Sequence, residues 1–67
     1  MDFVSFQEES ITIIDFKTDS LNDDQEFRKR YKGQLAMYKK AMQILYPDHS
    51  VQTYIYSLHL HKMIFIK

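Results

Sequence analysis

The sequence predicts an α/β fold with the element order β-β-α-β-β, in which a mixed sheet packs on one helix. Three observations predict it. Two short segments rich in β-branched and aromatic residues come first, at 3–7 and 11–17. A long stretch with helical periodicity follows at 25–46. Two further β-rich segments, 51–58 and 60–67, complete the chain.

Polar residues mark the connections between these elements. Residues 8–10 separate the first two strands, which predicts a hairpin. The connector 18–24 is rich in Asp, Ser and Asn, and it offers Asp23 or Asp24 as the N-cap of the helix. Pro47 is expected to end the helix, because proline has no backbone N–H to donate.

The helical stretch has one apolar stripe. Its apolar residues recur at intervals of three and four over five turns, which is the helical period. We expect this stripe to pack on one face of the sheet. Its members are Phe27, Tyr31, Leu35, Tyr38, Met42 and Leu45.

Length and composition limit the class of protein. The 67 residues form at most one small domain, and without cysteine neither disulfides nor a thiolate zinc site can support it. No apolar run reaches the roughly 20 residues that span a bilayer. The N-terminus lacks the basic lead and apolar block of a signal peptide. We therefore expect a soluble, cytoplasmic protein without a membrane partner.

The charges are unevenly distributed although the net charge is zero. Residues 1–26 hold eight acidic residues and one lysine, whereas residues 27–67 hold eight basic residues and one aspartate. An acidic part that binds metal, followed by a basic part that binds phosphate, suits a nucleic-acid enzyme. A solvated helix face explains the basic cluster equally well, so the charges alone leave both interpretations open.

The most informative chemical signal is the triplet Asp15-Phe16-Lys17 at the end of the second strand. Side chains two residues apart on a strand point to the same face, so Asp15 and Lys17 lie together. A carboxylate that holds a divalent cation, beside an ammonium that holds a phosphate or a water, is suited to cutting phosphodiester bonds. An exposed strand edge can carry such a pair by chance, so the triplet needs support from the rest of the chain.

Two residues inside the predicted helix have alternative interpretations. Gly33, the only glycine, costs about 1 kcal/mol relative to alanine in a helix. It indicates either a close approach to the backbone or a tolerated imperfection. Gln34 lies one turn before Tyr38, so their side chains share a helix face. The glutamine is either an edge residue or a group directed at a ligand.

The strand residues 14–19 read IDFKTD, and the helix residues 30–38 read RYKGQLAMY. Together and in this order they resemble the RecB-type nuclease domain of the PD-(D/E)xK superfamily. The likeness is closest to the C-terminal nuclease region of helicase–nuclease subunits of the AddA/RexA type. That family typically shows an (I/V)DYKTD strand and a YxxQ(L/M)xxY helix. The resemblance covers nearly the whole chain and implies a partial restriction-endonuclease-like core.

The resemblance implies a metal site. In the family, a further aspartate lies thirteen residues before the aspartate of the strand motif, and here Asp2 lies thirteen residues before Asp15. Asp2 and Asp15 then correspond to metal-binding carboxylates, and the backbone carbonyl of Phe16 corresponds to a third oxygen ligand. Such oxygen ligands suit Mg²⁺ or Mn²⁺.

The resemblance also implies catalytic residues, and the positive charge of the helix predicts DNA-binding residues. Lys17 corresponds to the lysine that orients or activates the attacking water and stabilises developing negative charge. Gln34 and Tyr38 correspond to the QxxxY motif of the family, which supports the site and the DNA strand. The DNA-binding residues are predicted on the basic helix face and are Arg28, Lys29, Lys32, Lys39 and Lys40.

The chain departs from the family pattern before Asp2. The family carries there a long helical segment with a further metal ligand, and it is fused to helicase domains. We therefore expect residues 1–67 to correspond to the C-terminal portion of the nuclease domain, without its N-terminal helical segment. The implied partners are DNA, the helicase domains and a second subunit. We expect feeble cleavage, or none, from this chain alone.

Two functions stay open from the sequence. In the first, the chain is the metal- and DNA-contacting core of a Mg²⁺-dependent exonuclease that acts in double-strand break repair and recombination. In the second, it is a non-catalytic remnant that self-associates or binds a partner through an exposed sheet surface. His59 and His61 are predicted on one strand face, where they are either surface residues or metal ligands.

Overall fold

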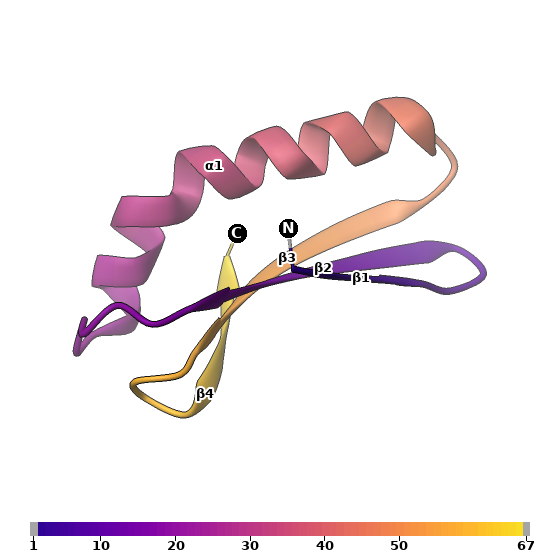
Figure 1. The fold of residues 1–67 in the computed structure, drawn as a ribbon. Coiled ribbons are helices and arrows are strands. Elements are labelled where there is room, and N and C mark those ends of the chain that lie inside the picture. Colours follow the sequence, from indigo (N-terminus) through magenta and orange to yellow (C-terminus); the bar gives the residue numbers. More distant parts are fainter. Residues whose placement is uncertain (1, 67) are drawn as a thin grey trace.

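In the computed structural model, which describes residues 2–66, one helix lies across one face of a four-stranded sheet (Figure 1). The observed order is β-β-α-β-β, so the predicted α/β fold is confirmed. The elements are β1 (Phe3–Phe6), β2 (Ser10–Lys17), α1 (Asp24–Leu45), β3 (Ser50–Ser57) and β4 (Lys62–Ile66).

The sheet is mixed, as predicted. Its strands lie in the spatial order β1-β2-β3-β4. The outer pairs β1–β2 and β3–β4 are antiparallel hairpins. The central pair β2–β3 is parallel, in a register that runs from Ser10 opposite Ser50 to Lys17 opposite Ser57. Parallel neighbours need a long crossover connection, and α1 provides it.

The first turn of α1 is capped as the sequence predicts. The side chain of Asp23 accepts a hydrogen bond from the backbone N–H of Gln25 at 3.0 Å. This bond satisfies one of the N–H groups that a helix start leaves unpaired. Asp24 adds negative charge in the same turn, where the helix dipole favours it. No helix within residues 2–66 is both long and apolar enough to cross a membrane.

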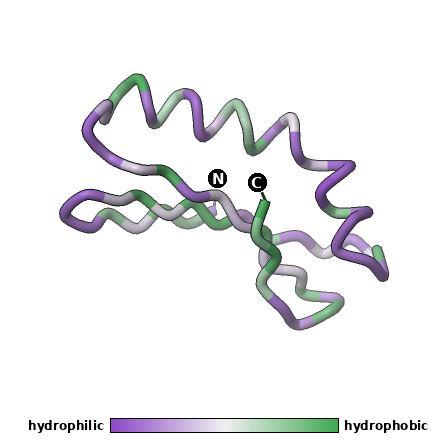
Figure 2. Tube along the Cα trace, turned by 180° about the vertical axis from the view of Figure 1, so that it is seen from behind, coloured by the Kyte–Doolittle hydropathy of each residue, from purple (hydrophilic) through white to green (hydrophobic). Residues whose placement is uncertain are grey.

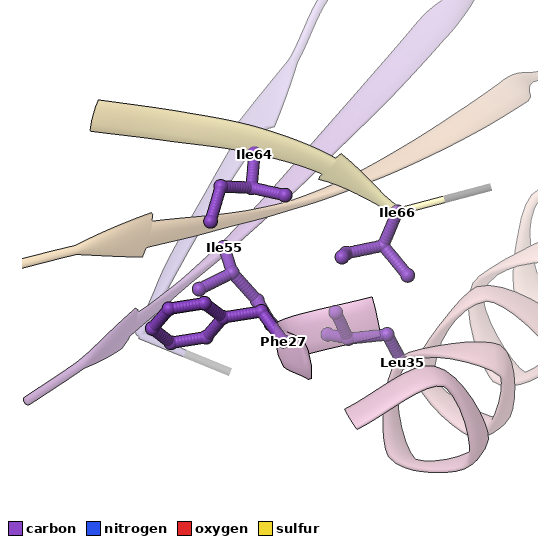
Figure 3. Packing of buried hydrophobic residues seen from close by; sticks show 5 residues of the cluster. All are labelled: Phe27, Leu35, Ile55, Ile64 and Ile66. Atoms are coloured by element: carbon purple, nitrogen blue, oxygen red, sulfur yellow. The ribbon is translucent and has the colours of Figure 1, made fainter. Parts of the chain in front are cut away.

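The core lies between α1 and the sheet in two clusters. In the smaller cluster, Ile11 and Ile13 of β2 meet Val51 of β3. Tyr38 packs against both clusters and so connects them. Figure 3 shows the larger cluster between the helix and the sheet, and its buried members are Phe27, Leu35, Ile55, Ile64 and Ile66.

The apolar stripe of α1 is the face that packs, except at its end. Phe27 and Leu35 are fully buried, and Met42 contacts the smaller cluster. Leu45 is 69% exposed. It is the last residue of α1, so the packed stripe ends one turn earlier than the periodicity predicts.

The sheet face that points away from α1 carries no covering element within residues 2–66 (Figure 1). We call this surface the outer face. Several of its large apolar side chains are about half exposed, as expected from the sequence. In Figure 2 most of β4 has the colour of hydrophobic residues, whereas much of α1 has that of hydrophilic residues. The outer face comprises Phe3, Phe16, Tyr54, Tyr56, Met63 and Phe65.

The connection between β3 and β4 differs from the prediction. The sequence predicts strands at 51–58 and 60–67, but residues 58–61 form a turn and β4 begins at Lys62. The hydroxyl of Ser57 accepts a hydrogen bond from the backbone N–H of Leu60 at 2.9 Å, which stabilises this turn. The predicted end of the strand, Lys67, lies outside the described residues.

The predicted pairing of His59 and His61 on one strand face is wrong, because both residues lie in this turn. His61 adopts the left-handed φ of 55°. The Nε2 atom of His59 lies 3.2 Å from Oδ1 of Asn22, within hydrogen-bond distance. His59 is therefore engaged with the connector before α1.

Candidate active site

Asp2 and Asp15 face each other at the open end of the β1–β2 hairpin. In the antiparallel register Phe3 pairs with Ile14, so the residue before Phe3 lies opposite the residue after Ile14. The carboxylate of Asp2 accepts a hydrogen bond from the backbone N–H of Phe16 at 2.8 Å. The two carboxyl groups lie close enough to change each other's pKa. The spacing of thirteen residues therefore brings two acidic side chains together.

The two carboxyl groups differ in their affinity for a proton. Burial raises the pKa of Asp15, which is only 4% exposed, and the neighbouring carboxyl of Asp2 raises it further. The ammonium of Lys17 opposes this rise. The interaction with the Asp15 carboxyl and the hydrogen bond from the N–H of Phe16 both lower the pKa of Asp2. Asp15 is thus the member of the pair that binds a proton more readily.

Lys17 completes the charged group on β2. Its Nζ lies 3.3 Å from Oδ2 of Asp15, and the strand alternation places both side chains on the face that α1 covers. Apart from this ion pair, Oδ2 of Asp15 is buried without a hydrogen-bond partner among residues 2–66. Buried polar atoms are normally hydrogen-bonded, so such a carboxylate oxygen indicates a place for a ligand.

The donor set around this oxygen fits a hard divalent cation. The backbone carbonyl of Phe16 points to the same side of β2 as its N–H, and that N–H is the group bonded to Asp2. Two carboxylates and a carbonyl are ligands that Mg²⁺ or Mn²⁺ accepts, with water completing the shell. Within residues 2–66, no three side chains of His, Cys, Asp or Glu are arranged to hold a metal ion. A cation here would therefore depend on the Asp2–Asp15 pair.

Gln34 and Tyr38 form a pair on the helix. The side-chain amide of Gln34 donates a hydrogen bond to the hydroxyl of Tyr38 at 3.1 Å. Gln34 is exposed, whereas Tyr38 is half-buried between the two core clusters. In the described part of the chain, no hydrogen bond connects either residue to Asp15 or Lys17. The structure therefore confirms that the two are neighbours, while their support of the site stays a prediction.

The structure adds two residues that the sequence analysis gave no role in the site. Nζ of Lys17 lies 4.4 Å from the ring centroid of Tyr31, and the hydroxyl of Tyr31 donates a hydrogen bond to Oδ2 of Asp19 at 2.6 Å. The sequence contained a signal for each of them. Asp19 lies two residues after Lys17, as Lys17 does after Asp15, so the three side chains are expected on one side of the chain. Tyr31 belongs to the packed stripe of the helix, where its hydroxyl needs a hydrogen-bond partner.

The basic helix residues lie apart from the carboxylate pair. Nε of Arg28 donates a hydrogen bond to the backbone carbonyl of Phe65 in β4 at 3.1 Å. β4 is an edge strand separated from β2 by β3. A surface pocket of about 430 Å³ lies between this side of α1 and β4, and it is lined by Gln25, Arg28, Lys29, Lys32 and Ile66.

Lys39 and Lys40 lie farther along the same side of α1. Lys39 lies eleven residues after Arg28 and Lys40 eleven after Lys29, which at 3.6 residues per turn returns each to nearly the same helix face. Lys39 is half-buried and Lys40 is exposed. The five basic residues predicted to bind DNA therefore share one side of α1, which we call the basic flank. Its first part, with Arg28, Lys29 and Lys32, borders β4 and not the site on β2.

Several proteins share local sequence similarity with this chain. A segment of an ATP-dependent helicase/nuclease subunit from Anoxybacillus flavithermus is 38% identical over 61 residues, which is 85% of this chain and 5% of that protein. A protein of the same name from Clostridium botulinum is 34% identical over 59 residues, or 88% of this chain and 5% of the relative.

A third relative is the exonuclease/helicase subunit RexA of Streptococcus pneumoniae, which is 33% identical over 48 residues, 72% of this chain and 4% of that protein. The chain thus spans only about a twentieth of the length of these relatives. No protein-family model matches the chain, and no solved structure matches it. Over most of its length, this chain is similar to a short segment of helicase/nuclease subunits of the AddA/RexA type.

Proposed function

We propose that this chain is the metal- and DNA-contacting part of a Mg²⁺-dependent DNA exonuclease of the PD-(D/E)xK superfamily. The observation that carries the proposal is the group of Asp2, Asp15 and Lys17, in which a buried carboxylate oxygen without a hydrogen-bond partner lies beside an ammonium. The local similarity to proteins named helicase/nuclease subunits supports it. In this proposal the wider function is double-strand break repair and recombination, together with helicase domains and a second subunit.

Each residue has a role in this proposal. Asp2, Asp15 and the carbonyl of Phe16 would hold Mg²⁺ or Mn²⁺, with Asp15 supplying its buried Oδ2. The bound cation would polarise the phosphate and lower the pKa of a coordinated water. Lys17 stabilises negative charge that develops on the phosphate, because its ammonium is already directed to this place by Asp15.

DNA would contact two sides of the helix. Gln34 and Tyr38 support the DNA strand at the site, and their hydrogen bond keeps the side-chain amide of Gln34 oriented. The basic flank of α1 binds phosphates farther from the reacting bond. Its pocket beside β4 contains three basic side chains, Arg28, Lys29 and Lys32, and phosphate contacts of this kind give affinity without sequence preference.

A second candidate function is a non-catalytic role in association. The observation that favours it is the outer face, where Phe3, Phe16 and Phe65 are each about half exposed. Exposed apolar patches of this kind mark contact surfaces in soluble proteins. In this alternative, the chain pairs with a second copy through the outer face and cuts no DNA.

The decisive experiment places the chain in a complete enzyme. The matched segment of the Anoxybacillus flavithermus protein is replaced by this chain, and digestion of linear DNA is measured with Mg²⁺ or Mn²⁺. We expect the chimera to cleave DNA, and Asp15→Asn and Lys17→Ala to abolish cleavage. The matched control is Lys62→Ala, because Lys62 of β4 pairs with Asp24 of α1 and lies outside the site.

The isolated chain provides the second arm. With Mn²⁺ and a high protein concentration, we expect feeble cleavage at most, and none from Lys17→Ala. An inactive chimera that folds, or a Lys17→Ala chimera as active as the parent, would contradict the nuclease proposal and favour the association role.

A further inference from the structure

Tyr31 provides a platform for the ammonium group of Lys17. Nζ of Lys17 lies 4.4 Å from the centroid of the Tyr31 ring, within the range of a cation–π contact. The same atom lies 3.3 Å from Oδ2 of Asp15. Lys17 is therefore held from two directions, by a carboxylate of its own strand and by an aromatic ring of the helix.

The orientation of the Tyr31 ring is restrained by contacts of its hydroxyl group and of its aromatic face. Its hydroxyl donates a 2.6 Å hydrogen bond to Oδ2 of Asp19, and Arg30 pairs with the same oxygen at 3.5 Å. On the core side, the ring stacks on Phe27, with centroids 6.4 Å apart and planes at 29°. Phe27 is fully buried. The Tyr31 ring cannot turn away from Lys17 without losing one of these contacts.

Such a platform answers a specific need of a lysine in an active site. A free lysine side chain samples many rotamers, and it loses that freedom when its ammonium must occupy one place. The Lys17 side chain is only 19% exposed, so its position is already restricted. Restriction before the reaction places the ammonium where charge develops.

The ring differs from Asp15 as a partner for Lys17. A carboxylate attracts an ammonium less strongly once its charge is shared with a cation, whereas the attraction of an aromatic face does not depend on that carboxylate. We propose that Tyr31 is a positioning residue for Lys17, and that Asp19 acts by orienting Tyr31. The proposal rests on the proposed function, in which Lys17 acts at the phosphate.

Nuclear magnetic resonance of the isolated chain tests the geometry without any cleavage. The ring current of Tyr31 shifts the Cε protons of Lys17 upfield and makes the two protons distinct, and Lys17→Arg identifies their signal. We expect Tyr31→Leu to move this signal to the position of exposed lysines. Tyr31→Phe keeps the ring, so it should retain part of the shift with a smaller difference between the two protons.

Two further variants complete the design. Asp19→Asn should act like Tyr31→Phe, because it weakens the bond that orients the ring. Tyr54→Leu, which removes a tyrosine of the outer face, should leave the Lys17 signal unchanged. A Lys17 signal at the exposed position in the unmodified chain would overturn the proposal. So would an unchanged signal in Tyr31→Leu or, if that variant does not fold, in both Tyr31→Phe and Asp19→Asn.

The chimeric enzyme connects the geometry to catalysis. There we expect Tyr31→Leu to lower kcat by up to about 100-fold with little change in KM, because the ammonium is misplaced while DNA binding persists. A normal kcat in a variant whose Lys17 signal has moved would overturn the positioning role. An inactive parent chimera would contradict the proposed nuclease function alone, since the resonance shift does not depend on cleavage.

Discussion

The carboxylate of Asp2 and the backbone N–H of Phe16 form a 2.8 Å hydrogen bond across the open end of the β1–β2 hairpin. This bond extends the contact between the two chain segments beyond Phe3, where the strand register ends. As a result, the side chain of Asp2 meets the buried carboxyl of Asp15. A cation at this pair would be bound by both carboxylates.

Cation binding should therefore stabilise the fold. We expect a dissociation constant of about 1 mM for Mn²⁺, because two carboxylates without further protein side chains bind weakly. At ten times this concentration the gain is about 1.4 kcal/mol. Thermal unfolding with and without Mn²⁺ measures it. Asp15→Asn should lose the gain and Asp48→Asn, in the turn before β3, should keep it, whereas an equal gain in both variants would refute the site.

The basic flank of α1 should bind DNA through phosphates. Each residue removed should lower the slope of log affinity against log salt concentration by about 0.7 to 0.9. Fluorescence anisotropy with labelled DNA over a salt series measures the slope for Lys32→Ala and Lys39→Ala. Lys62→Ala is the control, because its ammonium pairs with Asp24 at 2.7 Å. Affinity that does not change with salt would contradict phosphate binding.

Replacing Gly33 distinguishes its two interpretations, a close approach of DNA to the backbone or a tolerated imperfection of the helix. A Cβ added at this position meets nothing within 4 Å, so no part of the described chain requires a glycine there. Gly33→Ala should therefore stabilise the fold by about 1 kcal/mol in urea unfolding. If DNA approaches the backbone at Gly33, the same variant should bind DNA more weakly. Greater stability with unchanged DNA affinity would identify the glycine as a tolerated imperfection.

Tyr31 should titrate at high pH. Burial and then the hydrogen bond to Asp19 raise the pKa of Tyr31 above its usual value of 10.0. A raised pKa favours the protonated phenol in the folded state, so this stabilisation is complete below pH 10.0 and is lost as the pH rises through the folded pKa. Ultraviolet titration of tyrosinate, with Tyr31→Phe to assign the signal, should show a lower pKa in Asp19→Asn. No change in that variant would contradict the role of Asp19.

The outer face should cause self-association that depends on concentration. Phe65, on edge strand β4, is 46% exposed and packs against Tyr54. Sedimentation velocity should show that Phe65→Lys shifts the chain toward monomer, because a charge in an apolar contact is costly. Met37→Lys is the matched control, since Met37 is 73% exposed on α1. A monomer at all concentrations would contradict association through this face.

The sequence by itself determined the order and type of the elements. Enrichment in β-branched and aromatic residues and apolar recurrence with period 3.6 are local properties, and each element shows one of them. The same reasoning determined that Asp15 and Lys17 share a strand face, which the ion pair between them confirms. It also limited the helix cap to Asp23 or Asp24, and the structure shows that Asp23 is the cap.

Local patterns failed where an element is short or its end depends on packing. Residues 58–61 carry no glycine or proline, so the turn between β3 and β4 has no strong local signal. The turn is decided by the pairing of the two strands and by the bond from Leu60 to Ser57. The exposure of Leu45 likewise depends on where the chain leaves α1 for β3.

Only the tertiary structure decided how distant residues meet. The register of β1 on β2 brings Asp2 to Asp15, and the placement of α1 over the sheet brings the Tyr31 ring to Lys17. The placement of α1 also brings Arg28 of the basic flank to Phe65 of β4, away from the site on β2. These relations join residues that lie far apart in the sequence, up to thirty-seven positions for Arg28 and Phe65. They depend on packing of the whole chain, because neither helical nor strand periodicity relates residues on different elements.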